Sequence, residues 1–245
     1  MRHFSRISTI LLSLGALAAI AWASNPWDSK PYQQWSQKDV QQVLEHSPWV
    51  QSVSVAANWK TSSMLNPGET TNGGSPMMVG GGPMGGAAGL GMQPHEAHVK
   101  FQARWISAET VREAMARGEI LAGQITQAQA TTDLAQKQTD YEILLIGPDM
   151  TPFVHLTAAE LTNDSYLDIK GAKKKLEPSS VEIHRTPDGN QVLGITFQFP
   201  KTAANGEPMI GSNEKEVDFV CRVKDAKLNF RFHPRDMANR DGTDL

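Results

Sequence analysis

The chain has a single cysteine, Cys221, among its 245 residues. No internal disulfide can form within it, so its stability must come from packing. Its longest apolar run, residues 7–23, is shorter than the roughly 20 residues that a membrane-spanning helix usually needs. The sequence has no G-x-S-x-G, and Gly80-Gly81-Gly82 is not followed by the Lys-Ser/Thr of a phosphate-binding loop. These absences argue against a disulfide-stabilised scaffold and against two common catalytic motifs.

What the N-terminus does contain is the pattern of a secretory signal peptide, residues 1–23. A basic start, an apolar run and a small-x-small cleavage site follow in that order: Arg2 and Arg6, residues 7–20, and Ala21-Trp22-Ala23. We therefore expect cleavage after Ala23 and an exported protein, either periplasmic or secreted. The alternative is that residues 7–23 stay uncleaved and anchor the protein in the inner membrane, the one case in which a membrane is a partner.

The charge balance narrows the choice of partner. Cleavage would remove two of the 23 basic residues and none of the 26 acidic ones, so the formal net charge would fall from −3 to −5. Nucleic-acid binding needs a basic face, and no nucleic-acid partner is expected. We interpret the one basic run, Lys173-Lys174-Lys175, as a solvated turn. The partner is not identified by sequence; an envelope protein or an extracellular ligand would suit an exported chain.

Composition divides the mature chain into four segments. Residues 24–60 form a tryptophan-rich helix–strand segment, which we expect to pack on the main domain. Residues 61–96 are rich in Gly, Pro and Met, and we expect a flexible loop because glycine-rich chain loses much entropy on ordering. Residues 97–236 carry the patterns of an α+β domain. Residues 237–245 are polar, and we expect a disordered tail.

Hydrophobic periodicity places the helices and strands. Ser36 and Asp39 resemble a capping box for a helix over 37–46, and Ser107 is the expected N-cap of a helix over 108–117 that stops at Gly118. Alternating apolar residues predict strands over 50–60, 98–106, 141–146, 180–185, 192–199, 216–223 and 227–233, the last four as a meander. We therefore predict an α+β fold: an antiparallel sheet with short helices covering one apolar face.

The cysteine lies within the predicted strand 216–223. Cys221 shares its parity with Val217 and Phe219, whereas Asp218 has the opposite parity. Successive side chains of a strand point to opposite faces, so the thiol should face the core. We expect a structural cysteine and not a nucleophile.

The aromatic residues after the signal peptide are the first candidate binding site: Trp27, Tyr32, Trp35 and Trp49. One interpretation is an aromatic platform for a sugar or a partner peptide. The favoured interpretation is that the rings close the core over the helix at 37–46, with Trp27 alone exposed.

A second candidate is a metal site in and beside the glycine-rich loop, with Met77, Met78, Met84, Met92, His95 and His98 as ligands. Thioether and imidazole groups suit copper outside the cytoplasm. The spacing is irregular, however, and the His-Glu-Ala-His at 95–98 is not HExxH. A simple linker is the favoured interpretation, and no resident cofactor is predicted.

A third candidate is a catalytic cleft at the charged ends of the last strands. Asp218, Arg231 and His233 would have to converge on one pocket for such an enzyme. The other histidines are scattered along the chain, and the sequence favours a protein that is not an enzyme.

Three motifs together resemble a group of uncharacterised exported proteins of soil bacteria. They are W-S-x-K-D-V leading to S-P-W (Trp35 to Trp49), R-W-x-S-A from Arg104, and F-x-F-P from Phe197. That group has no established activity, so the resemblance implies export and supplies no catalytic residues. The leading functional hypothesis is an exported binding or envelope-associated interaction module; an extracytoplasmic copper-handling protein and an enzyme of unidentified class are the alternatives.

Overall fold

The computed structural model describes residues 25–57, 98–211, 213–224 and 226–245. The predicted signal peptide, the predicted flexible loop at 61–96 and five of the six predicted metal ligands therefore lie outside the described residues. Within them, no helix is long and apolar enough to cross a bilayer.

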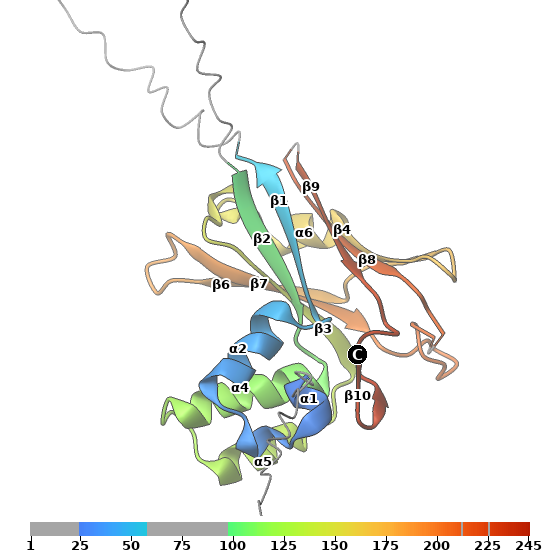
Figure 1. The fold of residues 1–245 in the computed structure, drawn as a ribbon. Coiled ribbons are helices and arrows are strands. Elements are labelled where there is room, and N and C mark those ends of the chain that lie inside the picture. The colour runs from blue at the N-terminus through green and yellow to red at the C-terminus, as the bar shows by residue number, and fades with distance from the viewer. Residues whose placement is uncertain (1–24, 58–97, 212, 225) are drawn as a thin grey trace, which may run out of the picture.

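Two antiparallel sheets form the centre of the molecule (Figure 1). The five-stranded sheet has the order β1 (Val50–Ala56), β2 (His98–Trp105), β3 (Asp140–Ile146), β7 (Val192–Pro200) and β6 (Ser180–Arg185). The four-stranded sheet has the order β5 (Lys174–Leu176), β4 (Ser165–Ile169), β8 (Val217–Val223) and β9 (Ala226–Phe232). A small hairpin pairs β10 (Ala238–Asn239) with β11 (Gly242–Thr243). The predicted α+β class with antiparallel sheets is confirmed.

Helices α1, α2, α4 and α5 gather at one end of the sheets, as Figure 1 shows. The helical segments are α1 (Pro26–Ser29), η1 (Tyr32–Gln34), α2 (Gln37–His46), α4 (Glu109–Leu121), α5 (Gln127–Leu134), η2 (Thr151–Phe153) and α6 (Ala158–Asn163). The Ser36–Asp39 capping box of α2 is present as predicted. Helix α4 runs through Gly118 instead of stopping there; it packs against α2, and Val40 lies 3.6 Å from where a Cβ of Gly118 would be.

The cover of the apolar sheet face is a second sheet and not the helices at 37–46 and 108–117. Phe197 on β7 meets Phe219 on β8 with ring centroids 5.0 Å apart, and Trp105 on β2 meets Phe232 on β9 at 5.2 Å. The four strands of the predicted meander are all present, but β6 and β7 join one sheet while β8 and β9 join the other. Each sheet therefore buries its apolar face against the other.

Cys221 lies at the centre of this core, as its parity predicted. The residue is fully buried. Burial raises the pKa of its thiol to about 12. A thiol in this state does not act as a nucleophile at ordinary pH.

The prediction of a disordered tail at 237–245 is wrong. Met237 is fully buried, and Asp244 is only 8% exposed despite its charge. The Asp244 carboxylate accepts hydrogen bonds from the backbone N–H groups of Glu109 (2.6 Å) and Thr110 (2.9 Å) at the start of α4. Local polarity predicted fraying, but these long-range bonds hold the segment in place.

The run of three lysines begins in a turn, as interpreted, and Lys173 there has a positive φ of 51°. Lys174 and Lys175 then start the exposed edge strand β5, and Lys175 Nζ lies 4.5 Å from the centre of the Tyr166 ring. Lysines on an edge strand discourage pairing with other chains, so the run has a structural explanation.

Candidate functional site

The aromatic side chains proposed as a platform are all buried. Trp35 and Trp49 are at most 1% exposed, and Tyr32 is 6% exposed. Trp27 is also only 6% exposed, so the expectation that it alone faces solvent is wrong. Its ring packs edge-on against Trp49, with centroids 5.4 Å apart. This contact explains the burial of Trp27, and a broad aromatic platform is not present at these positions.

Hydrogen bonds hold these aromatic side chains at the helical end of the molecule, where α1, α2, α4 and α5 gather. The Trp35 indole N–H lies 3.1 Å from the carbonyl oxygen of Lys30, and the Tyr32 hydroxyl accepts a bond from Gln127 at 2.7 Å. The Trp49 indole N–H donates to the carbonyl oxygen of Asp244 at 2.7 Å. The interpretation of the aromatic residues as a core over the first long helix agrees with these contacts.

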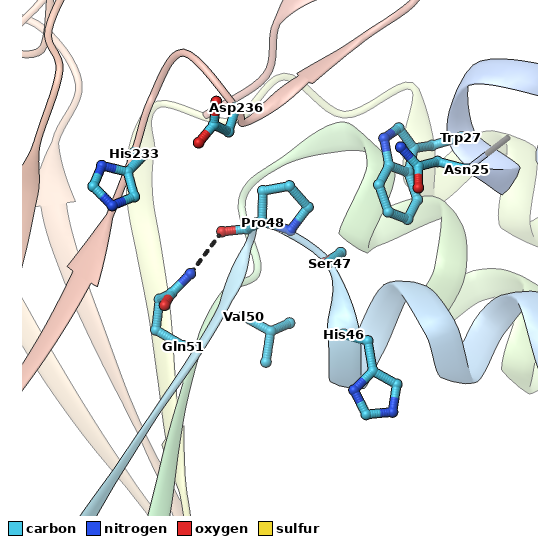
Figure 2. A pocket seen from close by; sticks show the side chains of 9 residues that line it. All are labelled: Asn25, Trp27, His46, Ser47, Pro48, Val50, Gln51, His233 and Asp236. Carbon is cyan, nitrogen blue, oxygen red and sulfur yellow. Dashed lines mark hydrogen bonds between the residues drawn. The ribbon is translucent and has the colours of Figure 1, made fainter. Parts of the chain in front are cut away.

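The structure instead forms a groove beside the buried aromatic residues, between the helical end and the end of β9 (Figure 2). Its volume is about 460 Å³. The residues that line it are Asn25, Trp27, His46, Ser47, Pro48, Val50, Gln51, His233 and Asp236. We call it the Pro48 groove.

Pro48 lies in the middle of this groove, two residues after the end of α2 at His46. The residue before a proline avoids the α region, and Ser47 adopts an extended conformation with φ −87° and ψ 167°. The Ser47 hydroxyl donates to the carbonyl oxygen of Val43 at 2.5 Å and is buried. The chain then turns into β1, where the Gln51 side-chain amide donates to the Pro48 carbonyl oxygen at 3.3 Å (Figure 2).

The two ends of the groove carry different polar groups. His233 and Asp236 lie on one side of Pro48, while His46 and Asn25 lie on the other (Figure 2). A ring nitrogen of His233 lies 3.2 Å from the Lys215 carbonyl oxygen. Among the described residues, the Asp236 carboxylate has no hydrogen-bond or ion-pair partner. It is therefore available to a ligand in the groove.

The Pro48 groove does not bring together a set of side chains that could act as a catalytic site. The Ser47 hydroxyl is already bonded to Val43, and the two histidines lie on opposite sides of Pro48. Across the described parts of the chain, no three His, Cys, Asp or Glu side chains are placed to hold a metal ion. What the groove offers is a mostly polar lining in which Pro48 and Val50 contribute apolar atoms between hydrogen-bonding groups, so it suits a ligand held mainly by polar contacts.

The predicted catalytic trio does not converge. Asp218 and Arg231 form an ion pair at 3.3 Å on the outer face of the four-stranded sheet, and Lys170 approaches Asp218 at 3.1 Å. His233 lies in the Pro48 groove instead. Asp218 is 3% exposed, and its ion pairs account for the burial of its charge.

Of the predicted metal ligands, the structure describes one. His98 is exposed at the start of β2. Met77, Met78, Met84, Met92 and His95 lie outside the described residues, so the copper site stays a prediction.

A second hollow lies where β3 ends, beside Gly147 and Pro148. Leu193 lines it and is 58% exposed. A Cβ on Gly147 would lie 2.7 Å from the Phe101 ring, which explains why glycine occupies this turn. Its lining also carries polar side chains, among them Gln102, Thr151 and Gln191.

Sequence reasoning named Trp27, and named His233 for a different site, but missed the other polar residues of the groove. Pro48 follows the end of the helix predicted over 37–46, but nothing in the sequence around it indicates a binding site. His233 and Asp236 lie almost two hundred residues further along the chain, and only the fold brings them beside Pro48.

Comparison with protein-family models, with curated proteins and with solved structures finds no match to this chain.

Proposed function

We propose that this chain is an exported, non-enzymatic binding module and that the Pro48 groove takes its ligand. The observation that carries the proposal is the composition of the groove. Apolar Pro48 and Val50 lie between polar groups on both sides, and one of these, Asp236, has a carboxylate unpaired within the described residues. The volume of about 460 Å³ is in the range of sites that bind small ligands or short peptide segments.

The chemistry of the lining favours a short peptide segment over a sugar. Sugars bind to exposed aromatic faces, and Trp27 is only 6% exposed, so it offers little ring surface to a sugar. A peptide would place apolar atoms on Pro48, hydrogen bonds on Gln51, and a Lys or Arg side chain on the Asp236 carboxylate. A segment of an envelope or extracellular protein with one basic and several apolar residues fits this description.

Export supports the choice of partner. The signal-peptide pattern of residues 1–23 directs the chain out of the cytoplasm, where envelope and extracellular proteins are the available partners. The resemblance to exported proteins of soil bacteria points the same way.

The test is binding of the mature protein to an arrayed set of short peptides that combine one Lys or Arg with apolar residues. We expect a subset to bind, and Asp236→Asn to weaken that binding about tenfold through loss of a charge-assisted bond. Asp133→Asn is the matched control, because it makes the same charge change on exposed α5.

Binding that Asp236→Asn and Gln51→Ala leave unchanged would place the ligand elsewhere and overturn the assignment of the groove. Saturable turnover of a substrate by the purified mature protein would overturn the non-enzymatic part of the proposal.

A further inference from the structure

One face of the five-stranded sheet, which we call the outer sheet face, points away from the four-stranded sheet. Successive residues of a strand point to opposite faces, so the outward residues are those that alternate with buried core residues. They are Gln102 and Arg104 on β2, Leu144 and Ile146 on β3, Gly194 and Thr196 on β7, and Glu182 and His184 on β6. Leu144 and Ile146 are half-buried and Glu182 is exposed, so solvent reaches this face.

A β-bulge turns an apolar side chain of β7 out to solvent. His184 opposes Gly194 in the pairing of β6 with β7. The next residue of β6, Arg185, opposes Val192, so Leu193 is an extra residue in β7. Val192 takes the buried position, and Leu193 is 58% exposed. Leu193 lines the hollow at the end of β3, which places it on the same side of the sheet as the outer sheet face.

Leu193 continues into an apolar strip because Gly194 has no side chain. Methyl carbons of Ile146 and Leu144 lie 3.1 and 3.2 Å from where a Cβ of Gly194 would be. These two side chains of β3 therefore lie across the backbone of β7 and extend the apolar surface from strand to strand. An exposed apolar surface with a polar rim is typical of an interaction site.

The two sides of the apolar strip carry opposite charges. In one row across the sheet, Arg104 on β2 is followed by Leu144 on β3, Thr196 on β7 and Glu182 on β6. Neighbouring strands lie about 4.8 Å apart, so the backbones at Arg104 and Glu182 are about 14 Å apart, too far for the two side chains to pair within one molecule.

Both charged side chains can still bond to a second molecule. The Arg104 Nε donates to the Gln102 side-chain oxygen at 3.0 Å, and Arg104 forms no ion pair among the described residues. The Glu182 carboxylate lies 3.7 Å from a ring nitrogen of His184, which is longer than a hydrogen bond. A guanidinium has five N–H donors and a carboxylate accepts several bonds, so neither group is saturated.

We propose that the outer sheet face binds a second copy of this chain and forms a weak symmetric dimer. A two-fold axis along the strands, between β3 and β7, places β2 of each copy over β6 of the other. Arg104 of each copy then lies over Glu182 of the other, and Leu144 lies over Thr196. Each of these contacts occurs twice, as in every isologous dimer. An axis across the strands would instead place β2 over β2 and bring the two Arg104 side chains together, so the charges favour the first arrangement.

The extent of the outer sheet face sets the strength of the dimer. Four strands at about 4.8 Å each make a contact about 19 Å wide. That is smaller than a standard interface of about 800 Å² per partner, so we expect a dimer that forms only at about 100 μM protein.

The dimer stands independently of the proposed peptide binding, because no residue of the outer sheet face lines the Pro48 groove. An axis along the strands leaves the two Pro48 grooves at the same end of the dimer. A ligand with two binding segments could therefore engage both grooves and gain in avidity.

The first test is sedimentation velocity of the mature protein between about 5 μM and about 500 μM. We expect a monomer–dimer equilibrium in the wild type. Glu182→Lys should weaken it at least about tenfold, because the symmetry repeats the like-charge contact with Arg104 twice. Leu193→Asp should weaken it as well, and both positions are exposed, so both variants should fold. Glu119→Lys is the matched control, because it makes the same charge change on an exposed residue of α4.

The second test mixes two variants that each associate poorly with themselves. In a mixed dimer of Arg104→Glu with Glu182→Lys, both contacts between positions 104 and 182 join opposite charges. We expect an equimolar mixture to dimerise about as strongly as the wild type. A wild type that stays monomeric up to about 500 μM, or a dimer that Glu182→Lys and Leu193→Asp leave unchanged, would overturn the proposal.

Discussion

Replacing Asp244 with alanine removes a helix cap that reaches α4 from 135 residues along the chain. Thr110 is 1% exposed, so its N–H would lose the Asp244 carboxylate in a place that water reaches poorly. Leaving a buried donor unpaired costs about 1–3 kcal/mol, and the loss of a helix cap typically costs about 1 kcal/mol. The Glu109 N–H is nearer the surface and regains a bond to water. We therefore expect Asp244→Ala to lower the free energy of unfolding by about 2 kcal/mol.

The assay is urea unfolding at about pH 7. In thermal unfolding of the same variant, a loss of about 2 kcal/mol corresponds to a fall in Tm of roughly 4–8 °C for a domain of this size. Asp244→Asn keeps an acceptor oxygen but loses the charge, so about half of that loss should remain. Asp133→Asn serves as the control for the charge change alone. A midpoint for Asp244→Ala equal to that of the wild type would refute the reasoning, because it would mean that the cap contributes nothing.

Three further outcomes are expected. Intact-mass measurement of the exported protein should give a chain that starts at Ser24, and an uncleaved mass would support the anchored alternative. Cys221 should react with a thiol reagent at about pH 8 at least about a thousandfold more slowly in the native protein than in urea, since burial raises its pKa to about 12. Asp39 should stabilise the protein above about pH 4 and lose that effect as the pH falls toward 2. Burial raises its pKa, but hydrogen bonds from Lys30 and Ser36 outweigh this and hold the pKa at about 2. The contribution, reduced for solvent screening, is about 1 kcal/mol and should vanish from a Tm–pH profile of Asp39→Asn.

Local features of the fold were predictable because their causes are local. The capping box of α2 depends on Ser36 and Asp39, which lie three residues apart. The inward position of Cys221 follows from the two-residue period of a strand. Helix α5 was harder to predict, since its sequence is rich in Gln, Ala and Thr, but its Thr126–Gln129 capping box is also a local signal.

Long-range features were not predictable in the same way. The burial of Trp27 depends on Trp49, and the order of residues 237–245 depends on the start of α4. Nothing near Asp244 in the sequence indicates that it will cap a helix more than a hundred residues away. The Pro48 groove has the same character, because only the tertiary fold brings Gln51 and Asp236 to one groove.

The sequence by itself determined the class of the fold, the positions of most helices and strands, and the inward face of each strand, because hydrophobic periodicity and capping are read from neighbouring residues. Only the tertiary structure decided which strands share a sheet, that one sheet covers the other, and that a polar terminal segment docks on α4. Those outcomes depend on which apolar faces and unpaired N–H groups meet in space, and a single cysteine with no disulfide to form leaves that choice entirely to packing.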